Sequence, residues 1–474
     1  MTRYIIYLAL ILIFSCNSNE NSQPNIVLII GDDHGWPYYG FMGNDIVKTP
    51  VLDSLANSGT VFTNGHVTSS ICRPSLRTLL TGLYPIQFDN YLDSMKIDFM
   101  ESNEYQSQIE NDFALAEFEH HIIKDFYTLP EMLRERGYRS FEAGKYWEGT
   151  YEMGGFDDGM SYRSGESLYE DYHILLAMAG GDGLKFARET QEPVYSFIKN
   201  NKEHPFFIWY APMLPHTPFN PPSDLLEIYK DLDISESAKV YYAMCTWFDR
   251  SLGEFLKFLR KENELDNTLL IYINDNGWQQ DPDEDYTNSL EYSTIGGPKG
   301  KKSLYDFGYR TPIIFNKKND IKGGLRSDEL VSSIDVFTTI LDYANSNIPK
   351  YLTGKSLVNL IKGEKTPIRE KIITYLKNPR VPGDPWAKGE TGYSYRSKDW
   401  HSFWVPQLDK INLYTSTTGV TASLKPDGKT ILLTDSKNGP LEIKNLSPRI
   451  SPAARKMAIG VGEAAGLGDI SGAI

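Results

Sequence analysis

Three continuous runs of apolar residues constrain the fold of this chain more than any other feature. Asn25–Gly31, Phe206–Tyr210 and Thr268–Ile273 lack the apolar–polar alternation of a half-exposed strand. They read instead as strands buried on both faces of a sheet. Helical patterns lie between them, including Pro130–Gly137 and Val240–Lys261. This alternation predicts an α/β domain with a large, mostly parallel sheet flanked by helices.

The composition changes beyond about Ile348. Two short strand-like stretches, Thr421–Leu424 and Lys429–Leu433, flank the turn signal Pro426–Gly428, which predicts a hairpin. We therefore expect a smaller C-terminal domain with an antiparallel sheet. The predicted division is a large domain over residues 24–347 and a smaller one over residues 348–474.

The N-terminus reads as a targeting segment. Arg3 precedes the apolar run Tyr4–Phe14, which is too short to span a bilayer as a mature helix, and Cys16 follows directly after a small residue. This pattern predicts a lipoprotein signal peptide over residues 1–15, lipid on Cys16, and a polar tether over residues 16–23. We expect an exported, membrane-anchored lipoprotein in the periplasm or on the outer-membrane surface of a Gram-negative bacterium. A plain secretory signal with a chance cysteine is the alternative.

Composition excludes some classes of function. The 474 residues are 41% hydrophobic and 23% charged, as in globular proteins, and the net charge is −14. With no stretch rich in Lys and Arg, we expect no nucleic-acid partner. The three cysteines imply no disulfide framework, and Cys245 lies in a helical pattern that predicts a buried core thiol. An anionic substrate remains compatible, because a local pocket can be positive inside an acidic protein.

Cys72 stands at a strand-to-helix turn. Pro74 suits a first helical turn, and Leu76, Leu79 and Leu80 recur at helical spacing. Cys72 is therefore expected at a helix N-terminus, where free N–H groups and the helix dipole favour an anion.

Polar pairs follow two of the predicted strands. Asp32 and Asp33 come after the first, and Asp275 and Asn276 after the third. Parallel sheets place ligands at the carboxyl ends of their strands, and carboxylate and amide oxygens suit a hard divalent cation. A solvated turn is the alternative for the first pair taken alone.

The segment Cys72–Gly82 resembles the signature of type I, formylglycine-dependent sulfatases of the alkaline phosphatase-like superfamily. The resemblance runs from about Asn25 to Leu360 and keeps the order of the family's motifs. The other matching segments are Asp32–Asp33, Gly144–Trp147, Pro215–Pro218, Asp275–Gly277 and Gly300–Pro312. It implies the family fold, a large mixed and mostly parallel sheet flanked by helices.

The resemblance also implies a chemistry. A maturation enzyme would oxidise Cys72 to formylglycine, whose hydrate attacks the sulfur of a sulfate ester. Lys145 and Lys301 would contact the sulfate, and His216, helped by Lys301, would act as the acid for the leaving oxygen. Calcium would be the metal, and a sulfated carbohydrate the substrate. The implied metal ligands are Asp32, Asp33, Cys72, Asp275 and Asn276, and the implied substrate-binding residues are Lys145, Trp147, His216 and Lys301.

Two positions depart from the family pattern. The signature has Arg four residues after the Cys, where this chain has Leu76, and Arg73 or Arg77 would have to substitute. Trp147 replaces the His that follows the Lys in the family. Tryptophan cannot accept a proton, so another base, or water, must regenerate the aldehyde, or turnover is slow. We expect Tyr146 and Trp147 to border the sulfate pocket, and the site-flanking tryptophans Trp36, Trp147 and Trp278 would suit stacking on sugar rings.

Two other functions remain open. One is a phosphodiester or phosphonate hydrolase of the same superfamily. The other is an inactive, lipid-anchored glycan-binding protein in which Leu76 prevents maturation and Trp147 prevents turnover.

Overall fold

A computed structural model describes residues 23–102, 118–161, 180–278, 300–304, 306–377, 391–397, 400–405, 410–415, 420–424, 430–435 and 439–444. The predicted signal peptide, Cys16 and the turn Pro426–Gly428 lie outside these residues, as does the tether up to residue 22. In the described part of the chain, no helix has both the length and the apolar character needed to cross a bilayer.

The larger of two sheets has nine strands in the order β4-β3-β5-β1-β6-β7-β2-β8, with β9 paired to β2. Among the described strands, β7 alone runs antiparallel to its neighbours in this sheet. The predicted mixed, mostly parallel sheet is therefore confirmed. The strands are β1 (Asn25–Gly31), β2 (Thr60–His66), β3 (Arg139–Gly144), β4 (Asp158–Gly159), β5 (Phe206–Ala211), β6 (Thr268–Asn274), β7 (Arg310–Asn316), β8 (Leu325–Ser327) and β9 (Val331–Ser332).

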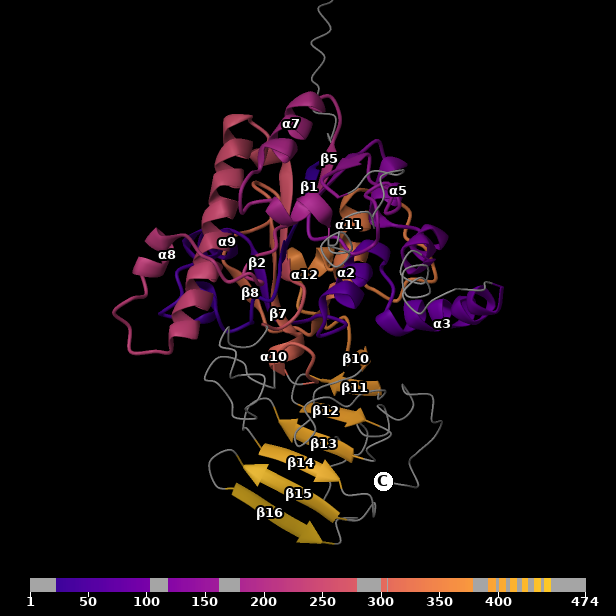
Figure 1. Cartoon of the computed structure of the whole chain (residues 1–474), viewed down its shortest axis with the longest axis vertical. Helices are drawn as coiled ribbons and strands as arrows, with labels where there is room; N and C mark the ends of the chain where they lie inside the picture. The colour runs from indigo at the N-terminus through magenta and orange to yellow at the C-terminus, as the bar shows by residue number, and fades with distance from the viewer. Residues whose placement is uncertain are drawn as a thin grey trace, which may run out of the picture.

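Helices cover both faces of this sheet (Figure 1). They include α7 and α9 on one side of the central strands and α2, α5 and α11 on the other. The helices are α1 (Pro50–Asn57), α2 (Cys72–Thr81), α3 (Pro85–Ser102), α5 (Leu129–Arg134), α7 (Glu192–Asn200), α8 (Ser223–Glu227), α9 (Glu236–Lys261), α10 (Asp306–Tyr309), α11 (Ser333–Tyr343) and α12 (Val358–Ile361). Short 3-10 helices span Gly40–Met42, Ile122–Asp125, Gly181–Lys185 and Leu265–Asn267.

Strand β1 shows why its sequence is apolar throughout. Ile26, Leu28 and Ile30 pack into the core beneath α2, α5 and α11, whereas Val27 and Ile29 pack into the core beneath α7 and α9. Because successive side chains of a strand point to opposite faces, a central strand covered on both sides needs apolar residues at every position.

The second sheet is a seven-stranded antiparallel meander in the order β10 to β16. It lies at one end of the larger body (Figure 1). Its strands are β10 (Ile372–Lys377), β11 (Thr391–Arg396), β12 (Trp400–Val405), β13 (Lys410–Thr415), β14 (Val420–Leu424), β15 (Thr430–Asp435) and β16 (Gly439–Lys444). The predicted hairpin corresponds to β14 and β15, which pair antiparallel.

The segment between the two sheets belongs to the packing of the larger one. Leu357, Leu360 and Ile361 lie in the core beneath α11. The smaller sheet also touches the larger body, because Arg396 on β11 lies 3.1 Å from Asp306 of α10. The domain boundary at residue 348 stays a prediction.

Candidate active site

The predicted metal ligands lie where two neighbouring strands end. β1 and β6 pair in parallel with Gly31 opposite Asn274, so the residues that follow them meet at one edge of the sheet. The Asp33 amide donates to Asp275 Oδ1 (3.1 Å), and Asn276 Nδ2 donates to Asp33 Oδ1 (2.6 Å). All of these side chains are buried, as is that of Asp32.

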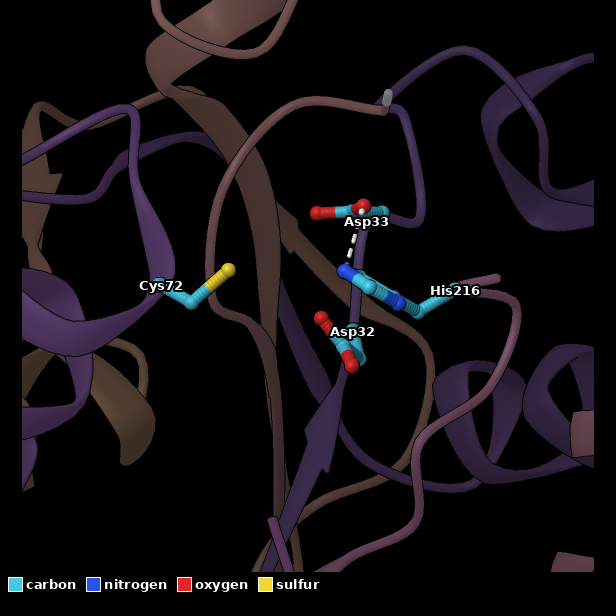
Figure 2. Close-up of side chains that lie close together, drawn as sticks. All are labelled: Asp32, Asp33, Cys72 and His216. Atoms are coloured by element: carbon cyan, nitrogen blue, oxygen red, sulfur yellow. Dashed lines mark ion pairs between the residues drawn. The ribbon is translucent and has the colours of Figure 1, made fainter. Parts of the chain in front are cut away.

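A cysteine and a histidine join this cluster from distant parts of the chain. One ligand atom each of Asp32, Asp33, Cys72 and His216 lies within 4.8 Å of the other three. Figure 2 shows Cys72 and His216 approaching the carboxylates from opposite sides. Asp275 is outside this group of four, but its hydrogen bond to Asp33 holds it at the edge of the cluster.

Each of the two predicted lysines pairs with one aspartate of this cluster. Lys145 follows β3 and donates to Asp32 Oδ1 (2.6 Å), and Lys301 Nζ lies 2.7 Å from Asp33 Oδ1. Burial alone would lower the pKa of both ammonium groups, but the adjacent aspartates raise each pKa above its usual value. Both lysines are therefore charged, although they are almost entirely buried.

The Cys72 thiol stands at the first residue of α2 and is 4% exposed. Burial raises the pKa of this thiol to about 12, although Lys145 and Lys301 act to lower it. The thiol is therefore protonated at neutral pH, when it is a weak nucleophile.

His216 lies in the loop that follows β5. Its Nδ1 is 2.8 Å from the Thr217 carbonyl oxygen, which can only accept, so Nδ1 carries a proton. Its Nε2 faces Asp33 Oδ2 at 3.6 Å. Burial lowers the pKa of His216 to about 4, outweighing the effect of the nearby aspartates. The neutral imidazole therefore presents a bare Nε2 to the cluster.

The residues present fit a divalent cation. Asp32 Oδ2, Asp275 Oδ2 and Asn276 Oδ1 are buried and have no hydrogen-bond partner among the described residues. Burial, reinforced by Asp32, raises the pKa of Asp275 well above its usual value. Three buried carboxylates face only two ammonium groups here. A cation with a preference for oxygen ligands would satisfy the orphaned atoms and reverse the net charge of the site.

Leu76, which replaces the signature Arg, packs in the core on the inner face of α2. Arg77 and Arg73 both bind Glu148, with Nε to Oε1 distances of 2.6 and 3.2 Å. Because Glu148 comes three residues after Lys145, these bonds tie the helix of Cys72 to the segment that carries Lys145. Sequence reasoning missed Glu148, although a buried acid is the expected partner of two arginines one helical turn apart.

The aromatic residues beside the motifs do not all border the site. Tyr146 is 1% exposed and packs edge-on against Phe156, and Trp278 is fully buried against Tyr241. The expectation for Tyr146 at the pocket and for Trp278 at a sugar ring is therefore wrong, because core packing takes up both rings.

Trp147 and Trp36 remain half-buried. Lys145 Nζ lies 5.9 Å from the centre of the Trp147 ring, which also packs against Leu184 and Met213. The guanidinium of Arg310 lies 4.1 Å from the centre of the Trp36 ring. Of the three tryptophan rings, that of Trp147 therefore lies beside a site lysine, whereas Trp278 meets Lys301 through its backbone carbonyl, which accepts from the Lys301 amide (2.9 Å).

Arg188 is a further residue that sequence reasoning missed. It binds the loop that carries His216, through carbonyl oxygens that include that of His216 itself. No pattern in the sequence pointed to it, since it lies in an irregular segment outside every matched motif.

Fold and site together define an α/β protein with a buried cluster of charged side chains and a cysteine at the carboxyl edge of its sheet. The sequence model of the family described as Sulfatase matches residues 24–346. The chain therefore belongs to the sulfatase family and is a sulfuric ester hydrolase, as the signature around Cys72 had implied.

Named relatives agree with this assignment. The chain is similar to an arylsulfatase of Clostridium perfringens, with 23% identity that covers 74% of this chain and 81% of the relative. It is 24% identical to human N-acetylgalactosamine-6-sulfatase, covering 81% and 74% of the two chains. The fold is similar to the crystal structure of Ps i-CgsB, with a TM-score of 0.67, 21% identity and coverage of 94% and 93%. That protein has also been solved in complex with k-i-k-neocarrahexaose.

Proposed function

We propose that this sulfatase removes sulfate from a carbohydrate, with a formylglycine derived from Cys72 as the nucleophile and calcium as the metal. The observation that carries the proposal is the burial of the Cys72 sulfur among Asp32, Asp33 and His216, within 4.8 Å of an atom of each. Side-chain oxygens dominate the remaining proposed ligands, which favours calcium over zinc. When bound, the cation supplies positive charge next to the sulfate oxygens.

The unmodified thiol would not sustain turnover. With its pKa raised to about 12 by burial, little thiolate exists at neutral pH. Attack by sulfur would also leave a thiosulfate ester with no second hydroxyl to expel the sulfate. An aldehyde hydrate has two hydroxyls, so one can attack while the other later eliminates sulfate and restores the aldehyde.

The chain's own residues take three parts in this proposal. Lys145 and Lys301, both charged, neutralise the sulfate oxygens as negative charge develops on the leaving alcohol. His216 is neutral in the free site, so it first takes a proton onto Nε2 and then donates that proton to the alcohol, since Nδ1 is already committed to the Thr217 carbonyl. The bound anion would supply the charge that favours a proton on Nε2. A base other than Trp147 regenerates the aldehyde.

Carbohydrate is the proposed substrate class because of what the relatives are named for. Human N-acetylgalactosamine-6-sulfatase is named for a sugar sulfate, and Ps i-CgsB was solved with a neocarrahexaose. We also propose that a formylglycine-generating enzyme matures Cys72, and that lipid on Cys16 anchors the exported protein to the membrane. The sequence pattern of the N-terminus supports the anchor.

The proposal is tested by comparing the hydrolysis of sulfate esters with that of phosphodiesters and phosphonates. The enzyme should hydrolyse nitrophenyl sulfate and a sugar sulfate in the presence of calcium, and should act poorly on nitrophenyl phosphodiesters and phosphonates. Preference for the phosphorus esters, with zinc or manganese supporting activity better than calcium, would favour the phosphodiester or phosphonate hydrolase instead.

Replacing His216 with alanine should lower kcat for a sugar sulfate by about 10²-fold. The loss on nitrophenyl sulfate should be much smaller, because an activated phenol leaves without protonation. Steady-state kinetics on the two substrates measures the difference. Equal losses on both would mean that His216 binds the sulfate rather than donating a proton.

Replacing Trp147 with alanine should raise KM for a carbohydrate sulfate more than for a small aryl sulfate. The half-buried ring offers an apolar face near Lys145, which suits stacking on a sugar. Trp147→His should not simply increase turnover, because the stacking surface is lost. A faster Trp147→His enzyme with unchanged KM would show that Trp147 slows catalysis and does not bind the sugar.

A further inference from the structure

One guanidinium holds the loop that carries His216. Arg188 Nε donates to the Met213 carbonyl (2.9 Å), and Nη2 donates to the carbonyls of Met213 and His216 (both 2.6 Å). Nη1 donates to the Pro218 carbonyl (3.1 Å) and to Asn220 Oδ1 (2.8 Å). A guanidinium has five N–H donors, so all of them are used within this one loop.

Few other described hydrogen bonds tie the loop to the rest of the molecule. It belongs to no helix or strand between the end of β5 at Ala211 and the start of α8 at Ser223. Its tie to the sheet is the Asp32 amide, which donates to the Leu214 carbonyl (3.0 Å), and this bond lies before His216. Arg188 binds on both sides of His216 as well as at His216 itself. Leu214 and Phe219 also pack on the core beneath α7 and α9, but the described hydrogen bonds that hold the backbone at His216 and Pro218 from outside the loop come from Arg188. The position of the imidazole relative to Asp33 is therefore sensitive to this side chain.

Arg188 itself also lies against helix α9. Its guanidinium lies 5.4 Å from the centre of the Trp247 ring, and Trp247 is a buried residue of the long helix α9. A cation over an indole face is attracted to it. The chain of contacts thus runs from a rigid helix through Arg188 to the loop and the imidazole.

A cavity of about 410 Å³ adjoins this arrangement, lined by Arg188, Trp247, Arg250 and Glu254 among others. Because the five donors of Arg188 are already engaged in the loop, the guanidinium has none left for a ligand in this cavity. Arg188 is therefore placed to support the loop and not to bind a ligand in the cavity.

We propose that Arg188 is a positioning residue that fixes His216 for proton transfer to the leaving alcohol. The inference rests on the proposed function, since it concerns the residue assigned there as the acid. A displacement of the acid by about 1 Å is enough to cost 10²-fold in rate. Loss of Arg188 should therefore lower kcat most for substrates whose leaving group needs to be protonated.

The first test compares leaving groups. Arg188→Ala should lower kcat on a sugar sulfate by about 10- to 100-fold and lower kcat on nitrophenyl sulfate far less. Arg188→Lys keeps the charge but not the planar fork, so its loss should be intermediate. Equal losses of Arg188→Ala on both substrates would overturn the proposal, because a general loosening of the site would affect both.

The second test is a double-mutant cycle. If Arg188 acts through His216, then adding Arg188→Ala to His216→Ala should change the rate on sugar sulfate by no more than about twofold. Losses that multiply would overturn the proposal. Full activity of His216→Ala alone would instead refute the proposed acid, whereas a deficient His216→Ala beside a fully active Arg188→Ala would refute only the inference about Arg188.

Two controls separate positioning from folding. Arg250→Ala removes another guanidinium from the same cavity, where Arg250 pairs with Asp224 (2.7 Å), and should leave the ratio of the two activities unchanged. Methylguanidinium is small enough for the cavity and should partly restore Arg188→Ala but not His216→Ala. Should Arg188→Ala fail to fold, the activity ratio of Arg188→Lys decides, because a wild-type ratio in that variant would overturn the proposal.

Discussion

Replacing Cys72 with alanine should abolish sulfate-ester hydrolysis and leave the fold intact. The side chain is small and lies at the first residue of α2, so the helix does not depend on it for its core contacts, which come from Leu76, Leu79 and Leu80. The chemistry does depend on it, because no other described side chain of the cluster can form an aldehyde hydrate. Activity on nitrophenyl sulfate and on a sugar sulfate, together with a thermal unfolding curve, measures both effects.

Cys245 supplies a matched control for this experiment. It is also a buried thiol, but it lies in the middle of α9. Cys245→Ala should keep full activity. Conversion of Cys72 to formylglycine should also make its peptide about 18 Da lighter, a covalent change that mass spectrometry of the protein from its native host detects. Fully active protein that holds only the unmodified thiol would refute the mechanism.

The same measurement addresses the departure at Leu76. An inactive protein with an intact Cys72 thiol that still binds a sulfated glycan would support the glycan-binding alternative. Leu76 packs in the core in place of the signature arginine, and Arg77 binds Glu148. The proposed maturation enzyme would act on the sequence around Cys72, so the mass of that peptide would report directly on whether Leu76 is tolerated.

The sequence carried the main features of the fold because of how β1, β5 and β6 are buried. A strand covered on both faces must be apolar throughout, so its run is visible without any alignment. The residues that follow parallel neighbours then meet at one edge, which brought Asp32–Asp33 and Asp275–Asn276 together as expected. Strands such as β4 and β9, with two residues each, are too short to leave any pattern.

The roles of other residues could not be predicted from the sequence, because they depend on where each side chain points and on which distant residues it contacts. Trp278 follows the predicted metal ligands Asp275 and Asn276 closely, yet its ring turns into the core against Tyr38 and Tyr241. Glu148 and Arg188 lie outside the family motifs. Glu148 binds Arg77, which is 71 residues away in the chain, and Arg188 binds the His216 carbonyl, which is 28 residues away. Proximity in sequence to a motif therefore predicted neither where a side chain points nor what holds the motif in place.

The second large effect concerns the metal, and it is expected from Asp275→Ala. In the folded protein Asp275 Oδ1 accepts from the Asp33 amide, while Oδ2 is buried and has no hydrogen-bond partner among the described residues. That orphaned oxygen is the one proposed to bind calcium. The variant should lose bound calcium and about 10³-fold or more in kcat/KM, because charge stabilisation by a metal is worth several kcal/mol.

Metal analysis and calorimetric titration with calcium measure the first loss, and kinetics on nitrophenyl sulfate measures the second. Asp249→Ala is the matched control, since Asp249 is another buried carboxylate but accepts from the Val51 and Leu52 amides at the start of α1 (2.9 and 2.8 Å). It should lower stability by about 1 kcal/mol, as loss of a helix cap does, and leave calcium binding unchanged. An Asp275→Ala protein with full metal content and full activity would exclude Asp275 as a ligand. Retained activity without bound calcium would refute the catalytic role of the metal itself, because Lys145 and Lys301 alone would then have to neutralise the sulfate.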